Sequence, residues 1–186
     1  SNLEKSRTAK TQMITDMETL IKKLYANKEA MKKREEELAR KRAEQNRATT
    51  GNFAKMKGNL IWPVQGKVTG KFGTIRNPNT GVVTENVGID IRAKSGTRIQ
   101  SVLDGVVSTI TYIRGYGNII IIDHGGGFST VYAQIDNITI HENEYIQMGS
   151  NIASVAIPKN NTMAKLHFEV WKNQEKLNPE YWLIQK

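Results

Sequence analysis

The stretch at residues 117–134, GNIIIIDHGGGFSTVYAQ, decides the fold class of this 186-residue chain. Its run at residues 119–122 is apolar on both faces, which is typical of a central, fully buried strand. Residues 125–127 are all glycine and supply a turn, and residues 128–133 read as a second strand. The stretch therefore predicts a β-hairpin near the centre of a sheet.

Short β-rich runs alternate with glycine-bearing turns from Leu60 onward. Such runs occur at residues 66–70, 97–102, 105–110 and 166–171. The part of the chain with this texture is long enough to bury a hydrophobic core. The sequence therefore predicts a mostly β domain over residues 59–186.

Residues 3–48 have a different texture, because they lack Gly and Pro and are rich in strong helix formers. Met17 and Leu24 share one heptad column, whereas the second apolar column fails after Leu20. An isolated helix is marginal unless a partner covers its apolar stripe. Residues 3–30 are therefore interpreted as one strand of a coiled coil.

The change in residue composition and pattern predicts that the chain has two structural parts. Residues 1–58 form a helical coiled-coil fragment with a regulatory arm, and residues 59–186 form the β domain. The arm is the charge-dense stretch at residues 32–47. Because a tethered segment has a high effective concentration, we expect it to lie across the binding site of the β domain in a resting state. A passive spacer is the alternative.

The basic charge of the chain is concentrated in its helical part. Residues 1–58 contain 15 Lys or Arg against 8 Asp or Glu, whereas residues 59–186 contain 12 against 10. A solvated helix face or an acidic partner accounts for this excess. Nucleic acid is not expected as a partner, because the basic stretch has almost no aromatic residues on which bases could stack.

Several other classes of protein are excluded. No run of about 18 apolar residues occurs, so direct membrane insertion is not expected. The chain opens with Ser-Asn and no signal-peptide pattern, which favours a processed or cloned fragment. Without cysteine, disulfides and thiolate metal sites are absent. Neither glycine-rich turn is followed by a predicted helix, so phosphate loops are not expected.

Motifs of the β part resemble those of LytM/lysostaphin-type zinc endopeptidases. They appear in the family's order within residues 62–73, 88–107, 115–133, 166–170 and 177–183. The preceding coiled coil and the altered active-site positions make the chain similar to EnvC-type murein hydrolase activators. The resemblance implies a mostly β fold, in which a LytM-type antiparallel β-sheet domain follows a long α-helix.

The same resemblance implies that a zinc site has been lost. In active LytM enzymes an HxxxD pair and the second histidine of an HxH motif bind zinc, and further histidines assist the metal-bound water. Here the first motif runs from Asn86 to Asp90, the second has Lys165 before His167, and Gln134 replaces a histidine of the hairpin. Zinc hydrolysis needs three protein ligands and an open position. We therefore expect no metal, no cofactor and no catalytic residue.

The remaining polar residues are expected to satisfy one another. Asp90 and His167 should stay hydrogen-bonded, with Lys165 balancing the carboxylate. His124 precedes a glycine turn and His141 lies in an acidic stretch. Both are interpreted as surface or satisfied histidines and not as replacement ligands.

The resemblance implies a periplasmic regulatory protein. EnvC-type proteins bind and switch on N-acetylmuramoyl-L-alanine amidases at the division site, and their coiled coil links them to the FtsE–FtsX complex of the inner membrane. A divergent zinc endopeptidase and a structural peptidoglycan-binding module are the alternatives. A partner-binding groove over the sheet is expected to be lined by Asn86, Asp90, Arg92, Tyr132, Gln134, Lys165, His167 and Glu169.

Overall fold

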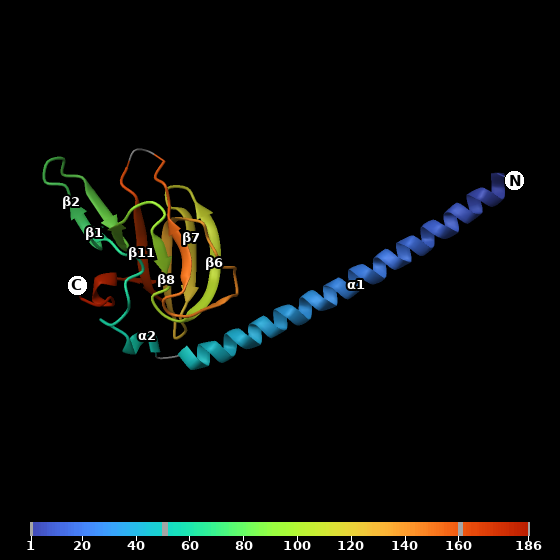
Figure 1. The fold of residues 1–186 in the computed structure, drawn as a ribbon, viewed down its shortest axis with the longest axis horizontal. Helices are drawn as coiled ribbons and strands as arrows, with labels where there is room; N and C mark the ends of the chain where they lie inside the picture. Colours follow the sequence, from blue (N-terminus) through green and yellow to red (C-terminus); the bar gives the residue numbers. More distant parts are fainter. Residues whose placement is uncertain (1, 50–51, 160–161, 186) are drawn as a thin grey trace. The chain divides into compact units, whose positions relative to one another are not determined.

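The computed structural model describes residues 2–49, 52–159 and 162–185 of the chain. The chain forms two compact units, one up to Lys41 and the other from Arg42 onward. The first unit is a single helix, and the second is mostly β (Figure 1).

Helix α1 (Asn2–Thr49) is the helix that the stretch without Gly or Pro predicts. Its threonine hydroxyls bond back to carbonyls one turn earlier, as Thr11 Oγ1 does to the Arg7 carbonyl at 3.0 Å. The apolar stripe is exposed, from 47% at Ile21 to 72% at Met31. An apolar stripe adds stability only when a partner covers it. No described helix combines the length and the apolarity needed to cross a bilayer.

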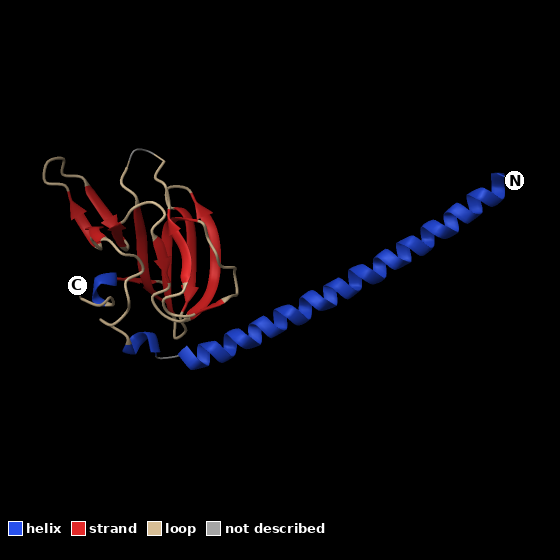
Figure 2. Cartoon of the chain, in the orientation of Figure 1, coloured by secondary structure: helices blue, strands red, loops and turns tan. Residues whose placement is uncertain are grey.

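The β unit is built mainly of strands, which Figure 2 shows in red. Its described elements are α2 (Asn52–Lys55), β1 (Lys67–Gly70), β2 (Gly73–Arg76), β3 (Val83–Asn86), β4 (Ile89–Arg92), β5 (Arg98–Gln100), β6 (Gly105–Ile113), β7 (Gly117–Asp123), β8 (Phe128–Asp136), β9 (Tyr145–Ile146), β10 (Asn151–Val155), β11 (Lys165–Lys172), β12 (Glu175–Leu177) and the 3-10 helix η1 (Pro179–Tyr181).

Within the described residues, one large sheet has the strand order β1-β4-β11-β8-β7-β6-β9. Strands β10, β5 and β12 attach to its side, and β2 and β3 form a separate hairpin. Neighbouring strands pair antiparallel. The β7–β8 hairpin lies in the middle of the order, as residues 117–134 predict. An antiparallel, mostly β fold after a long helix is thus confirmed.

Strands β4 and β11 carry apolar and polar side chains on opposite faces. Ile91 pairs with Leu166 and Ile89 pairs with Phe168, and all four side chains are fully buried. Because residues paired across two strands point to the same face, this face belongs to the core. The alternate residues of both strands point the other way, and that face carries the candidate site.

The core of the β unit includes the segment that precedes the first strand. Phe53 of α2 is fully buried, and its ring centroid lies 4.7 Å from that of Phe128 and 5.2 Å from that of Trp182. A fragment that begins at residue 59 would therefore lack a core side chain. The two domains predicted at residues 1–58 and 59–186 stay a prediction.

Candidate functional site

The polar face of β4 and β11 gathers most of the charged residues that the motifs single out. Asp90 pairs with His167, and Arg92 pairs with Lys165, in the register of the two strands. Glu169 lies two residues after His167 and so shares its face. We call this surface the site face; it consists of Asp90, Arg92, Lys165, His167 and Glu169.

Four hydrogen bonds join the members of the site face other than Arg92, together with the neighbouring Trp171, into one network. Lys165 Nζ donates to Asp90 Oδ2 at 2.7 Å. His167 Nδ1 lies 2.9 Å from Asp90 Oδ1, and His167 Nε2 lies 2.9 Å from Glu169 Oε1. Trp171 Nε1 donates to Glu169 Oε2 at 2.5 Å. Both ring nitrogens of His167 therefore face carboxylates, and each carboxylate has two partners.

The network determines the charge of His167. Burial alone lowers the pKa of this imidazole, but the hydrogen bonds and negative charges of Asp90 and Glu169 outweigh it and raise the pKa to about 9. Burial of Asp90 opposes its ionisation, yet the hydrogen bonds and charges of His167 and Lys165 hold the pKa of Asp90 below its usual value. At neutral pH an imidazolium and an ammonium thus balance two carboxylates.

The donor set of the site face does not fit a zinc ion. A histidine ligand must be neutral and offer a lone pair, whereas a protonated His167 donates from both nitrogens. The Lys165 ammonium already occupies Asp90 Oδ2. In the part of the chain that the structure describes, no group of three His, Cys, Asp or Glu side chains is placed to hold a metal ion.

An apolar patch continues the site face across the next two strands. Ala133 pairs with His167 on one side and with Ile119 on the other, so these residues share a face. The patch lies apart from the main core and consists of Ile119, Val131 and Ala133, which are buried, with the partly buried Ile121 and Trp171 packed against them.

The β6–β7 hairpin supplies the margin of the site. The ring centroid of Tyr116 lies 5.5 Å from that of His167, and the Tyr116 carbonyl accepts the amide of Gln134 at 2.8 Å. Tyr116 itself is 41% exposed. The charged network is therefore bordered by an exposed aromatic side chain.

Two of the three predicted residues that replace histidines, Asn86 and Gln134, lie outside the network. Asn86 ends β3, and its Oδ1 accepts the amide of Gly88 at 3.2 Å. Gln134 has a φ of 62° and sits where the register between β7 and β8 shifts. Among the described residues, no hydrogen bond joins either side chain to Asp90 or His167.

Tyr132 requires a correction, because it does not lie on the site face. It pairs with Phe168 on the core side and is fully buried. Its hydroxyl accepts the amide of Val102 at 3.1 Å. The neighbour Ala133, and not Tyr132, shares a face with His167. The partner-binding role of the other seven predicted residues stays a proposal.

Two glycines make room for the carboxylates of the network. A Cβ on Gly70 would lie 2.6 Å from Asp90 Oδ2, and a Cβ on Gly88 would lie 2.8 Å from Glu169 Cγ. Sequence reasoning placed both glycines in motifs but missed this role, because close approach depends on how the strands pair.

Sequence reasoning also missed Trp171 and Tyr116. A signal for Trp171 was available, because it continues the alternation of Lys165, His167 and Glu169 along one strand. Tyr116 lies in a turn, and no local pattern indicates that its ring reaches a histidine of another strand.

The other two histidines do not contribute to the site, as the sequence predicts. His124 is buried, with Nδ1 2.7 Å from the Asp104 carbonyl and Nε2 2.7 Å from Thr130 Oγ1. Burial lowers the pKa of His124 to about 4. His141 is exposed, and its amide donates to Glu144 Oε2 at 2.9 Å.

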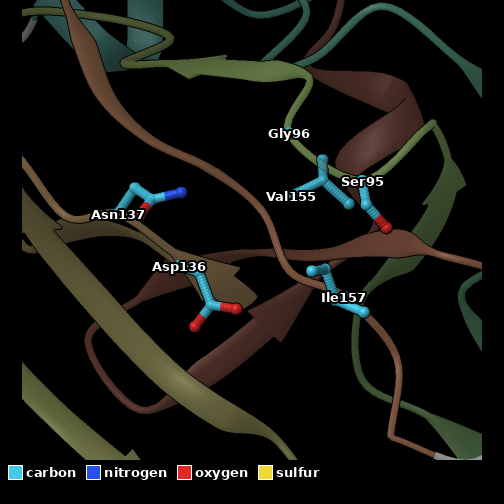
Figure 3. Close-up of a pocket in the computed structure, with 6 residues that line it drawn as sticks. All are labelled: Ser95, Gly96, Asp136, Asn137, Val155 and Ile157. Atoms are coloured by element: carbon cyan, nitrogen blue, oxygen red, sulfur yellow. The ribbon is translucent and has the colours of Figure 1, made fainter.

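Two open pockets lie elsewhere on the β unit. One of about 410 Å³ has Asp136 and Asn137 across from Val155 and Ile157 (Figure 3). The other, of about 330 Å³, lies at the turn of residues 125–127. Neither includes a residue of the site face, so the groove that the resemblance implies there stays a prediction.

Comparison with known proteins finds a matching protein family and similar relatives. The sequence model of Peptidase family M23 matches residues 84–179. The murein hydrolase activator NlpD of Escherichia coli K12 is 33% identical over 126 residues, which cover 67% of this chain and 31% of that protein. The murein hydrolase activator EnvC of the same strain is 26% identical over 134 residues, which cover 72% and 31%. The chain thus spans about a third of the length of these curated relatives.

A solved structure agrees with the fold. A zinc containing peptidase from Vibrio cholerae superposes with a TM-score of 0.60 and is 25% identical, over 67% of this chain and 40% of that chain. The likeness covers about two thirds of the chain and confirms the LytM-type sheet.

Proposed function

This chain belongs to peptidase family M23, and from that premise we propose that it is a non-catalytic activator of cell-wall amidases. Its relatives NlpD and EnvC are named murein hydrolase activators. We infer that the site face binds an N-acetylmuramoyl-L-alanine amidase and raises its activity, while the chain itself cuts no bond in peptidoglycan.

The observation that carries the proposal is the closed network of the site face. A zinc hydrolase needs a neutral histidine ligand, an acidic ligand and an open position for water. Here the Lys165 ammonium forms an ion pair with the Asp90 carboxylate, and His167 lies between the carboxylates of Asp90 and Glu169. These residues stabilise one another's charges, so they support a binding surface better than a metal-dependent reaction.

The surroundings of the network are suited to a protein partner. Arg92 is exposed, and the Lys165 side chain is 35% exposed. Tyr116, which is 41% exposed, borders the same surface. Because aromatic residues and arginine are enriched in protein interfaces, an autoinhibitory segment of the amidase is the proposed occupant. Its capture would free the zinc site of the amidase.

The helical unit supports the second part of the proposal. Its exposed stripe is suited to a coiled coil, through which the chain would connect to an FtsE–FtsX-type complex of the inner membrane. Such a connection requires that the activator act in the periplasm, where peptidoglycan lies.

The proposal is tested by measuring the binding of the full chain to a purified amidase by biolayer interferometry. Saturable binding is expected. Tyr116→Ala should weaken it about tenfold or more, because tyrosine is enriched among the residues that contribute most of the binding energy in protein interfaces. Tyr181→Ala is the matched control, since Tyr181 is exposed on η1 and outside the site face. No binding by the wild-type chain would refute the proposal.

The two alternative functions give different results. A divergent zinc endopeptidase would carry one zinc per chain and release fragments from peptidoglycan without an amidase. A structural module would sediment with intact cell-wall sacculi but would not bind the amidase. Either result would replace the activator as the function of this chain.

A further inference from the structure

A row of three cations crosses the sheet beside the network. Lys67 of β1 pairs with Arg92 of β4, and Arg92 pairs with Lys165 of β11. Residues that pair directly across antiparallel strands point to the same face. Lys67, Arg92 and Lys165 are therefore consecutive neighbours on the site face, and we call them the basic row.

The basic row has little negative charge to balance it. Lys67 and Arg92 are exposed, and neither forms an ion pair within the described residues. Lys165 forms an ion pair with Asp90, whose carboxylate also contacts His167. Like charges directly opposite each other destabilise a sheet. The row therefore opposes folding, which points to a role in binding.

The spacing of the basic row is suited to carboxylates on a protein segment. Neighbouring strands lie about 4.8 Å apart. Acidic side chains one helical turn apart have Cβ atoms separated by about 5–6 Å, and alternate residues of a strand are about 6.6 Å apart. Both spacings place two carboxylates against two neighbouring cations. Arg92 can bind one of them through two parallel hydrogen bonds.

We propose that the basic row binds acidic side chains of the amidase segment that docks on the site face, an inference that rests on the proposed function. Charge complementarity favours an acidic partner. The β2–β3 hairpin, which follows β1, exposes Ile75, Val82 and Val83, and such apolar side chains favour a protein segment over the small, polar peptides of peptidoglycan.

The test uses the double variant Lys67→Gln/Arg92→Gln of the full chain. Lys165 is kept because it belongs to the network. The variant should unfold at the same temperature as the wild type or at a higher one, because it removes repulsion between like charges. Lys55→Gln is the control for the loss of a cation elsewhere on the β unit, since Lys55 is exposed on α2, outside the sheet.

Amidase binding is measured by interferometry over a series of salt concentrations. At low salt the double variant should bind about threefold to thirtyfold more weakly, mainly through slower association, and its affinity should depend less on salt. Lys55→Gln should bind like the wild type. Equal affinity of the double variant and the wild type at every salt concentration would overturn the inference and leave the proposed function standing.

Two further outcomes are distinguishable. If the wild-type chain binds no amidase, the proposed function fails and the inference fails with it. If the double variant keeps its amidase affinity but no longer sediments with sacculi, the basic row serves peptidoglycan, and the assignment to the amidase is wrong.

Discussion

The two faces of strands β4 and β11 share the same backbone, but different interactions stabilise them. Leu166 and Phe168 are fully buried on the core face, where apolar area removed from water drives folding without regard to direction. Asp90 and His167 on the site face depend on particular partner atoms at 2.7–2.9 Å. The difference indicates that one face can change its chemistry while the other preserves the fold.

The largest expected effect is a loss of stability on the core face. Phe168→Ala should lower the free energy of unfolding by about 3–5 kcal/mol, because it removes a buried ring and leaves a cavity. Urea unfolding followed by tryptophan fluorescence measures this in the β unit, which contains all three tryptophans. Phe168→Leu should cost less. A loss below about 1 kcal/mol for Phe168→Ala would contradict the division between the faces.

The pH dependence of stability should separate a core histidine from a site histidine. The pKa of buried His124 is lowered to about 4, and that of His167 is raised to about 9. In the unfolded chain both histidines have a pKa of about 6.5. Below pH 6.5 the unfolded chain therefore binds more protons at His124 than the folded chain does, whereas above pH 6.5 the folded chain binds more protons at His167. Stability should therefore peak near pH 6.5.

The alkaline side of this profile tests the site face. The stabilisation from His167 is fully present below about pH 6.5 and is lost by about pH 9, a change on the order of 3 kcal/mol at most. His167→Gln should remove the alkaline slope and keep the acid slope that His124 causes. Urea unfolding at several pH values measures both. An alkaline slope unchanged in His167→Gln would show that another group titrates.

A smaller effect is expected when Asp90 is replaced. Asp90→Ala leaves Lys165 and His167 without their shared carboxylate, which should cost about 1–3 kcal/mol. Asp90→Asn keeps a hydrogen-bond acceptor and should cost less. Thermal unfolding of the two variants beside the wild type checks the order. Equal and negligible losses would mean that the network contributes nothing to stability.

The smallest effect is expected from removal of metal. Because the donor set of the site face does not fit zinc, treatment with a chelator should leave the melting temperature unchanged, and the purified chain should contain no stoichiometric zinc. Elemental analysis after dialysis measures the zinc content. One zinc per chain that is lost in Asp90→Ala or His167→Ala would contradict this prediction.

Sequence patterns predicted the parts of the molecule that rest on local periodicity. The central hairpin and the long helix are confirmed. The ion pair of Lys165 with Asp90, which was predicted from the family motifs and not from periodicity, is also present. The motifs did not reveal which face Tyr132 occupies, because its side depends on pairing with Phe168.

Features that depend on tertiary packing were missed. Phe53 lies in a stretch with the composition of a linker, yet it packs with the rings of Phe128 and Trp182. Glu169 was predicted as a contact residue, but its position between His167 and Trp171 follows only from side-chain geometry. The resting position of residues 32–47 stays a prediction.

The most direct test of a non-catalytic, activating site face is the release of soluble fragments from labelled peptidoglycan. Four reactions are compared: buffer, the full chain, an amidase, and the chain with the amidase. The chain alone should release no more label than buffer, and the mixture should release clearly more than the amidase alone. Chelator-sensitive release by the chain alone, or a mixture no more active than the amidase, would contradict the account.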